Sequence, residues 1–136
     1  MLCKIALQLL LTMMLIGCGQ SRVERTHLTG QVTFDGQPIS KGRILFIPDN
    51  GPTWGAEIRE GTYSTEGTKG VPTGDLRVEI EAYRTPASYQ PSNTDAPEDA
   101  PQEQYVPAKF NTQSELRMTI EPGSGKVEKD FQLNSQ

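Results

Sequence analysis

Apolar and polar residues alternate along several short stretches of the chain, and each stretch ends at a turn-like composition. In residues 27–34 and 75–83, every second side chain is apolar or small, the pattern of strands with one buried face. The apolar positions are Leu28, Val32, Phe34, Leu76, Val78, Ile80 and Ala82. The other face of the second stretch is charged, and we expect it to be solvated.

Other stretches predict further strands. Residues 44–47 are continuously apolar, which predicts a central strand, and weaker alternation predicts strands near 54–58, 116–120 and 127–133. Trp54 shares its face with apolar neighbours, so we expect its ring in the core or at the edge of the core. The dipeptides Asp35-Gly36 and Glu60-Gly61 predict hairpin turns.

No segment shows convincing helical periodicity. The chain has 13 Gly and 10 Pro, which agrees with many turns and few long helices. Seven or so short strands predict an all-β fold, a seven-stranded Greek-key-like two-sheet sandwich over residues 27–134. Residues 85–104 lack periodicity and are rich in Pro and acidic side chains, so we expect a mobile acidic loop within this domain.

The chain begins with a different pattern. After Lys4, residues 5–16 are apolar except for Gln8 and Thr12, which is the length of a signal-peptide core and too short for a transmembrane helix. The run ends in "LIGC", residues 15–18, which closely resembles the lipobox of bacterial lipoproteins.

The lipobox resemblance implies a signal peptide of residues 1–17 that is cleaved before Cys18. The thiol of Cys18 would carry diacylglycerol and its new amino group a further acyl chain, such as palmitate, with residues 18–26 as lipidated terminus and tether. Two or more chains anchor a protein stably where one does not. The alternative, a buried or disulfide-bonded Cys18, has only Cys3 as a partner and would require the signal to be retained.

By analogy with other lipoproteins, Gly19 after the cysteine favours the outer membrane over inner-membrane retention. We therefore expect a cell-envelope protein on the periplasmic or surface side. Its partners would include the membrane, through the lipid on Cys18, and an envelope protein or polysaccharide.

Several segments, in order, resemble the landmarks of carboxypeptidase regulatory-like, or transthyretin-like (prealbumin-like), domains in small lipoproteins of planctomycetes. They are "GQVTFDGQPISKGRILFIP", "AEIREGTYS", "GVPTGDLRVEIEAY", "VPAKFNTQSELRMTI" and "KDFQL". The resemblance implies a prealbumin-like sandwich that is usually non-catalytic and has binding roles.

Charge and residue types exclude some functions. The net charge is −4, and no basic stripe is present, which argues against nucleic acid. His27 is the sole histidine, whereas catalytic histidines need positioned partners and zinc sites several His or Cys ligands. We expect no catalytic residues, no metal and no cofactor. A hydrolase, the enzyme branch of the resembled fold, remains only as a residual alternative.

The aromatic residues outside the core pattern are the remaining binding candidates. Tyr83 lies on the outward face of its strand, and Tyr89 and Tyr105 flank the acidic loop. Tyrosine rings supply apolar area with a polar tip. We therefore expect a non-enzymatic, lipid-anchored envelope protein that displays its sandwich for protein contact or assembly. The alternative is a carbohydrate- or cell-surface-polymer-binding module that uses these three tyrosines.

Overall fold

The computed structural model describes residues 23–92 and 100–136. The predictions for the signal peptide, for Cys18 and for residues 93–99 of the acidic loop therefore lie outside the described residues. The described strands are β1 (Arg25–Phe34), β2 (Gln37–Pro38), β3 (Lys41–Pro48), β4 (Trp54–Arg59), β5 (Thr62–Ser64), β6 (Val71–Pro72), β7 (Gly74–Arg84), β8 (Glu103–Gln104), β9 (Arg117–Ile120), β10 (Lys126–Glu128) and β11 (Phe131–Leu133). One 3-10 turn, η2 (Ala108–Phe110), is the helical element of this region.

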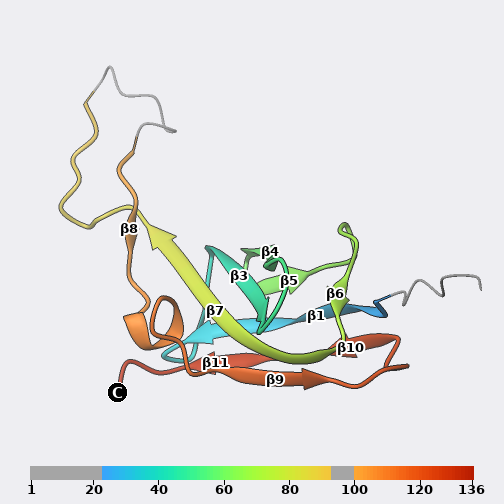
Figure 1. Ribbon diagram of the computed structural model, residues 1–136. Helices are drawn as coiled ribbons and strands as arrows, with labels where there is room; N and C mark the ends of the chain where they lie inside the picture. The colour runs from blue at the N-terminus through green and yellow to red at the C-terminus, as the bar shows by residue number, and fades with distance from the viewer. Residues whose placement is uncertain (1–22, 93–99) are drawn as a thin grey trace, which may run out of the picture.

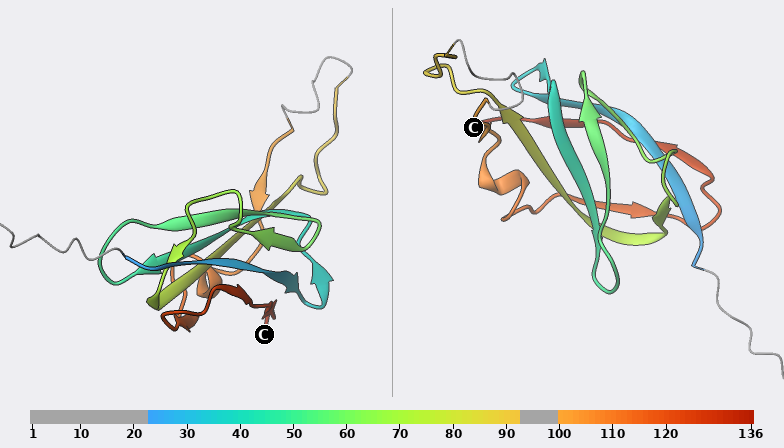
Figure 2. Two further views of the ribbon diagram at one scale, coloured as in Figure 1. Left: turned by 90° about the vertical axis from the view of Figure 1, so that its right-hand side faces the viewer. Right: turned by 90° about the horizontal axis from the view of Figure 1, so that it is seen from above.

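The prediction of an all-β fold is confirmed, and the strands form one curled sheet. Within the described residues this sheet has eleven strands, with the main order β10-β1-β5-β4-β3-β7-β8. β10 and β11 run parallel to β1, and the other pairs are antiparallel. β9 and β11 lie below β3, β4 and β5, so the sheet curls around its own inner side (Figure 1, Figure 2).

The inner side of the curled sheet holds one hydrophobic core. Its members come from strands along the described chain, from Ile39 between β2 and β3, and from Val106 in the loop before η2. The largest fully buried side chains are Phe46, Leu28, Ile39, Ile44, Ile58, Leu76, Ile80, Ile120 and Leu133. The alternating positions predicted for β1 and β7 are buried here, apart from Phe34, which is half-buried at the edge of the core.

β3 is a central strand, as its apolar run predicts. It pairs with β4 on one side and with β7 on the other. The charged face of β7 lies outward, as expected, but most of its side chains are only partly exposed. Glu79 is 14% exposed and Glu81 is 17% exposed, each in an ion pair with an arginine.

Both predicted hairpin turns are present as two-residue loops. Asp35-Gly36 joins β1 to β2, and Glu60-Gly61 joins β4 to β5. All four residues have positive φ, between 49° and 78°, as a type I′ turn requires.

The C-terminal strand expected at 127–133 is split into β10 and β11. At the break, the Lys129 carbonyl oxygen approaches β1 so closely that a Cβ on Gly30 would lie 2.0 Å from it. The same carbonyl accepts a hydrogen bond from Tyr63 Oη at 2.8 Å, and Gly30 lies opposite Tyr63 of β5. A glycine is therefore needed at residue 30 because the turned-in carbonyl occupies the side-chain position.

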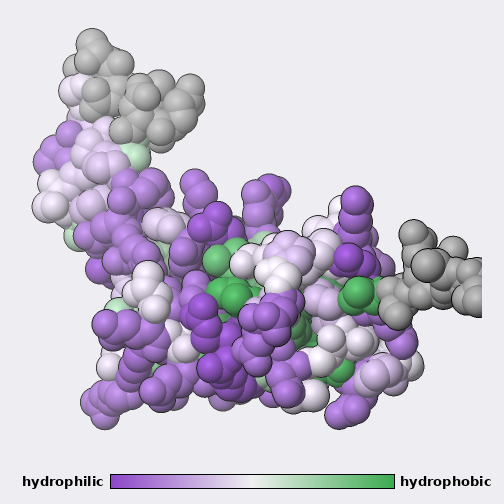
Figure 3. Space-filling model, viewed as in Figure 1, coloured by the Kyte–Doolittle hydropathy of each residue, from purple (hydrophilic) through white to green (hydrophobic). Residues whose placement is uncertain are grey.

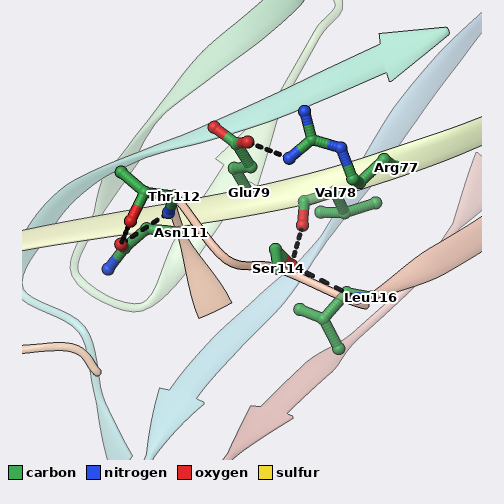
Figure 4. A network of polar contacts seen from close by, with 7 residues as sticks. All are labelled: Arg77, Val78, Glu79, Asn111, Thr112, Ser114 and Leu116. Atoms are coloured by element: carbon green, nitrogen blue, oxygen red, sulfur yellow. Dashed lines mark hydrogen bonds and ion pairs between the residues drawn. The ribbon is translucent and has the colours of Figure 1, made fainter. Parts of the chain in front are cut away.

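The segment between β8 and β9 is fixed to β7 by the buried side chain of Ser114, and Asn111 braces the segment internally (Figure 4). Ser114 Oγ donates to the Val78 carbonyl at 2.5 Å and accepts from Leu116 N–H. Asn111 Nδ2 donates to the Val106 and Pro107 carbonyls. These hydrogen bonds satisfy backbone groups that the sheet does not pair.

Two boundaries differ from the sequence prediction. β1 begins at Arg25, inside the range assigned to the tether, and Thr26 is buried. β8 lies inside the predicted loop of 85–104 and pairs with the end of β7, where Arg84 Nε binds Glu103 Oε1 at 2.8 Å. The two ends of the acidic loop are thus joined by a short antiparallel pairing of β7 with β8.

Candidate binding groove on the outer face

The outer face of β3, β4 and β7 carries rows of charged side chains. The register places Arg43 of β3 between Glu57 of β4 and Glu81 of β7, and it places Lys41 opposite Arg59. Directly opposed residues in antiparallel strands share a face at about 4.5–5.5 Å between Cβ atoms. Opposite charges from three strands therefore meet on one surface.

Two ion pairs organise this surface. Arg43 Nη2 lies 2.7 Å from Glu81 Oε2, and Arg59 donates through Nε and Nη2 to Glu57 Oε2. The Arg59–Glu57 pair is exposed, with side chains 80% and 68% accessible. Exposed pairs contribute little to stability, so their main effect is to orient donors and acceptors.

Tyr83 joins the same network from the end of β7. Its hydroxyl donates to Glu81 Oε2 at 3.0 Å, the oxygen that also accepts from Arg43. Burial, followed by the hydrogen bond to Glu81, raises the pKa of Tyr83. The ring is half-buried, and its hydroxyl stays a protonated donor at neutral pH.

These side chains line a groove of about 760 Å³, which we call the charged groove. It is lined by Lys41, Arg43, Glu57, Arg59, Glu60 and Tyr83, with Ser40, Gly42 and Ile58. Its volume is within the range of about 300–1,000 Å³ typical of ligand sites. A second hollow of about 510 Å³ adjoins it over β4 and β5 and shares Glu57 and Arg59 with it.

The three candidate tyrosines do not form one platform. Tyr83 lines the charged groove, whereas Tyr105 packs against the core, with its ring 5.8 Å from Phe34 in an edge-on arrangement. The Arg84 guanidinium lies over the Tyr105 ring at 5.1 Å. Tyr89 lies in the loop after β7, where its N–H donates to the Pro86 carbonyl.

The side chains of Trp54 and His27 both contact other parts of the fold. Trp54 is half-buried against the core, as expected, and Arg25 covers its ring at 4.1 Å. His27 Nδ1 lies 3.1 Å from the Thr65 carbonyl oxygen.

No group of three or more His, Cys, Asp or Glu side chains in residues 23–92 and 100–136 is placed to hold a metal ion. In the same two ranges no helix has the length and apolar character needed to cross a membrane.

The sequence analysis named Tyr83 as a binding candidate, but it did not name the charged side chains that line the groove with it. The sequence does indicate that these side chains share a face within each strand. Every second residue is charged at Lys41 and Arg43, and again at Glu57 and Arg59. Alternation assigns a residue to a face, but it does not give the register that brings the rows together.

Comparison of the chain with protein-family models, with curated proteins and with solved structures gives no significant match. The resemblance to transthyretin-like domains is therefore a matter of motifs alone.

Proposed function

We propose that this chain is a non-enzymatic, lipid-anchored envelope protein that displays its β-domain for protein contact or assembly, with the outer membrane as its favoured location. The observation that carries the proposal is the lipobox-like "LIGC" ending at Cys18, with β1 beginning at Arg25. Seven residues span at most about 25 Å when fully extended. A lipid on Cys18 would therefore hold the domain close to the membrane surface.

We also propose that the fold is the seven-stranded transthyretin-like sandwich of carboxypeptidase regulatory-like domains. Three of the eleven described strands, β2, β6 and β8, have two residues each. Without them, and with β10 and β11 counted as the single C-terminal strand of the sequence pattern, seven strands remain. The two hairpin turns and the single core support this assignment.

The membrane anchor is tested by replacing Cys18 with Ala in the full chain. We expect the variant to move from the membrane to the soluble fraction and to lose labelling by radioactive palmitate, because the thiol that accepts the lipid is gone. Cys3→Ala is the matched control, since it removes the other cysteine and should leave both properties unchanged. A Cys18→Ala protein that stays labelled and membrane-bound would contradict the proposed anchor.

Protein contact is tested by affinity capture from detergent-solubilised native envelope, with the full lipidated chain as bait. We expect one protein in stoichiometric amount. An eluate without protein would count against protein contact as the function.

The second candidate function is a carbohydrate- or cell-surface-polymer-binding module. It is supported by the position of Tyr83, an aromatic ring within a groove lined by paired hydrogen-bonding groups.

A further inference from the structure

We propose that a neutral glycan chain lies across the outer face from β7 to β5 and occupies the charged groove and the adjoining hollow together. This inference rests on the part of the proposed function that makes the domain a binding module, and it names the ligand of its groove.

The two hollows form one continuous track. The charged groove of about 760 Å³ lies over β3, β4 and the end of β7, and the hollow of about 510 Å³ lies over β4, β5 and the loop that follows. They share Glu57 and Arg59, whose ion pair is the boundary between them. The track crosses the strands, so it suits an extended chain better than a single small molecule.

The charge along the track favours a neutral ligand. Lys41, Arg43 and Arg59 are balanced by three carboxylates, those of Glu57, Glu60 and Glu81. A polyanion would need an excess of cations, and here two of the three are already paired. A polycation would need an excess of carboxylates, and the equal numbers of the two charges do not provide one.

The hydrogen-bonding groups of the track match sugar hydroxyls. A hydroxyl both donates and accepts, and each arginine–carboxylate pair places N–H donors beside carboxylate acceptor oxygens. The adjoining hollow adds the hydroxyls of Thr62 and Ser64. Thr62 Oγ1 donates to the Arg59 carbonyl and keeps its acceptor capacity, while Ser64 Oγ accepts from Glu66 N–H and keeps its donor.

The described surface shows few large exposed hydrophobic side chains. Val23, at the start of the described chain, is the exposed large hydrophobic residue of the described ranges, at 61%, and it does not line the track. The view in Figure 3 is largely hydrophilic, with apolar residues in small areas. Protein interfaces concentrate apolar and aromatic area at their centre, whereas Tyr83 is the only aromatic side chain of the charged groove.

The test is calorimetric titration of the full, lipidated protein in detergent micelles. The probes are neutral hexasaccharides, namely cellohexaose, maltohexaose and mannohexaose, with hexagalacturonate as the acidic probe and hexalysine as the basic one. We expect at least one neutral hexasaccharide to bind and the charged probes to bind more weakly. Failure of all three neutral probes, or tighter binding of a charged probe, would overturn the proposal.

Variants then locate the ligand. We expect Tyr83→Ala to weaken binding about three- to tenfold, the change in affinity that corresponds to the loss of one aromatic contact. Tyr83→Phe keeps the ring and should keep most of the affinity. A Thr62→Ala/Ser64→Ala variant should weaken the hexasaccharide but not the corresponding trisaccharide bound in the charged groove. Lys109→Ala, on η2 and outside the lining of both hollows, is the control and should bind normally.

Equal binding by all of these variants would place the glycan elsewhere and contradict the inference. The outcome is separable from the membrane anchor, because palmitate labelling and membrane fractionation of the Tyr83→Ala protein should be unchanged in every case.

Discussion

Tyr63 links three distant parts of the chain. Its ring lies 6.0 Å from Phe46 and 6.2 Å from Phe131, and its hydroxyl donates to the Lys129 carbonyl. Burial, and secondarily the carboxylate of Asp130, raise the pKa of this hydroxyl above its usual value. The folded state therefore favours the protonated form of Tyr63 more strongly than the unfolded state does.

The first prediction concerns the pH dependence of stability. A raised folded-state pKa contributes stability that is complete below the unfolded tyrosine pKa of about 10 and is lost as the pH rises above it. Tyr63→Phe should cost about 0.5–1.5 kcal/mol at pH 8, through the lost hydrogen bond, and should lessen the fall in stability between pH 10 and 11.5. Urea unfolding across this range measures both effects, and parallel pH profiles for the two proteins would refute the prediction.

The turn between β4 and β5 shows how an element is shaped by local chemistry and close packing together. Glu60 has φ of 49°, a left-handed conformation that is unfavourable for glutamate. Gly61 has φ of 76°, and a Cβ there would lie 2.6 Å from Pro38 Cβ. The turn therefore contains one residue suited to its conformation and one that is not.

The second prediction follows from this turn. Glu60→Asn should raise the free energy of unfolding by about 0.4–1 kcal/mol, because asparagine tolerates the left-handed region better. Chemical denaturation with an unchanged m-value is the measurement. Gly61→Ala should have the opposite effect at the neighbouring position, and a destabilised Glu60→Asn protein would show that the side chain of Glu60 matters more than its backbone.

β7 illustrates how far sequence predicts an element. The burial of Leu76, Val78, Ile80 and Ala82 follows from alternation. The half-burial of Glu79 and Glu81 does not, because it depends on neighbouring strands: β3 supplies Leu45 opposite Glu79 and Arg43 opposite Glu81.

At the scale of the whole molecule, one core connects the first strand to the last. Leu28 of β1 and Leu133 of β11 belong to the same cluster of buried residues as Phe46 of β3. A domain with a single core is expected to unfold cooperatively.

The third prediction tests this single core. Phe46→Ala should cost about 3–5 kcal/mol, and Trp54 fluorescence and far-ultraviolet circular dichroism should still report the same unfolding midpoint. Leu45→Ala is the matched control on the opposite, half-buried face of the same strand, with a cost of about 1–2 kcal/mol. Separate midpoints for the two signals would contradict a single cooperative core.

The sequence by itself determined the all-β class, the buried faces of β1 and β7, and the two hairpin turns. These features follow from period-two alternation and from glycine-containing turn dipeptides, which act within a few residues. Only the tertiary structure decided the register that sets Arg43 between Glu57 and Glu81, and the break of the last strand where Lys129 meets Gly30. Such features depend on contacts between residues far apart in the chain, and the pattern around either partner carries no information about them.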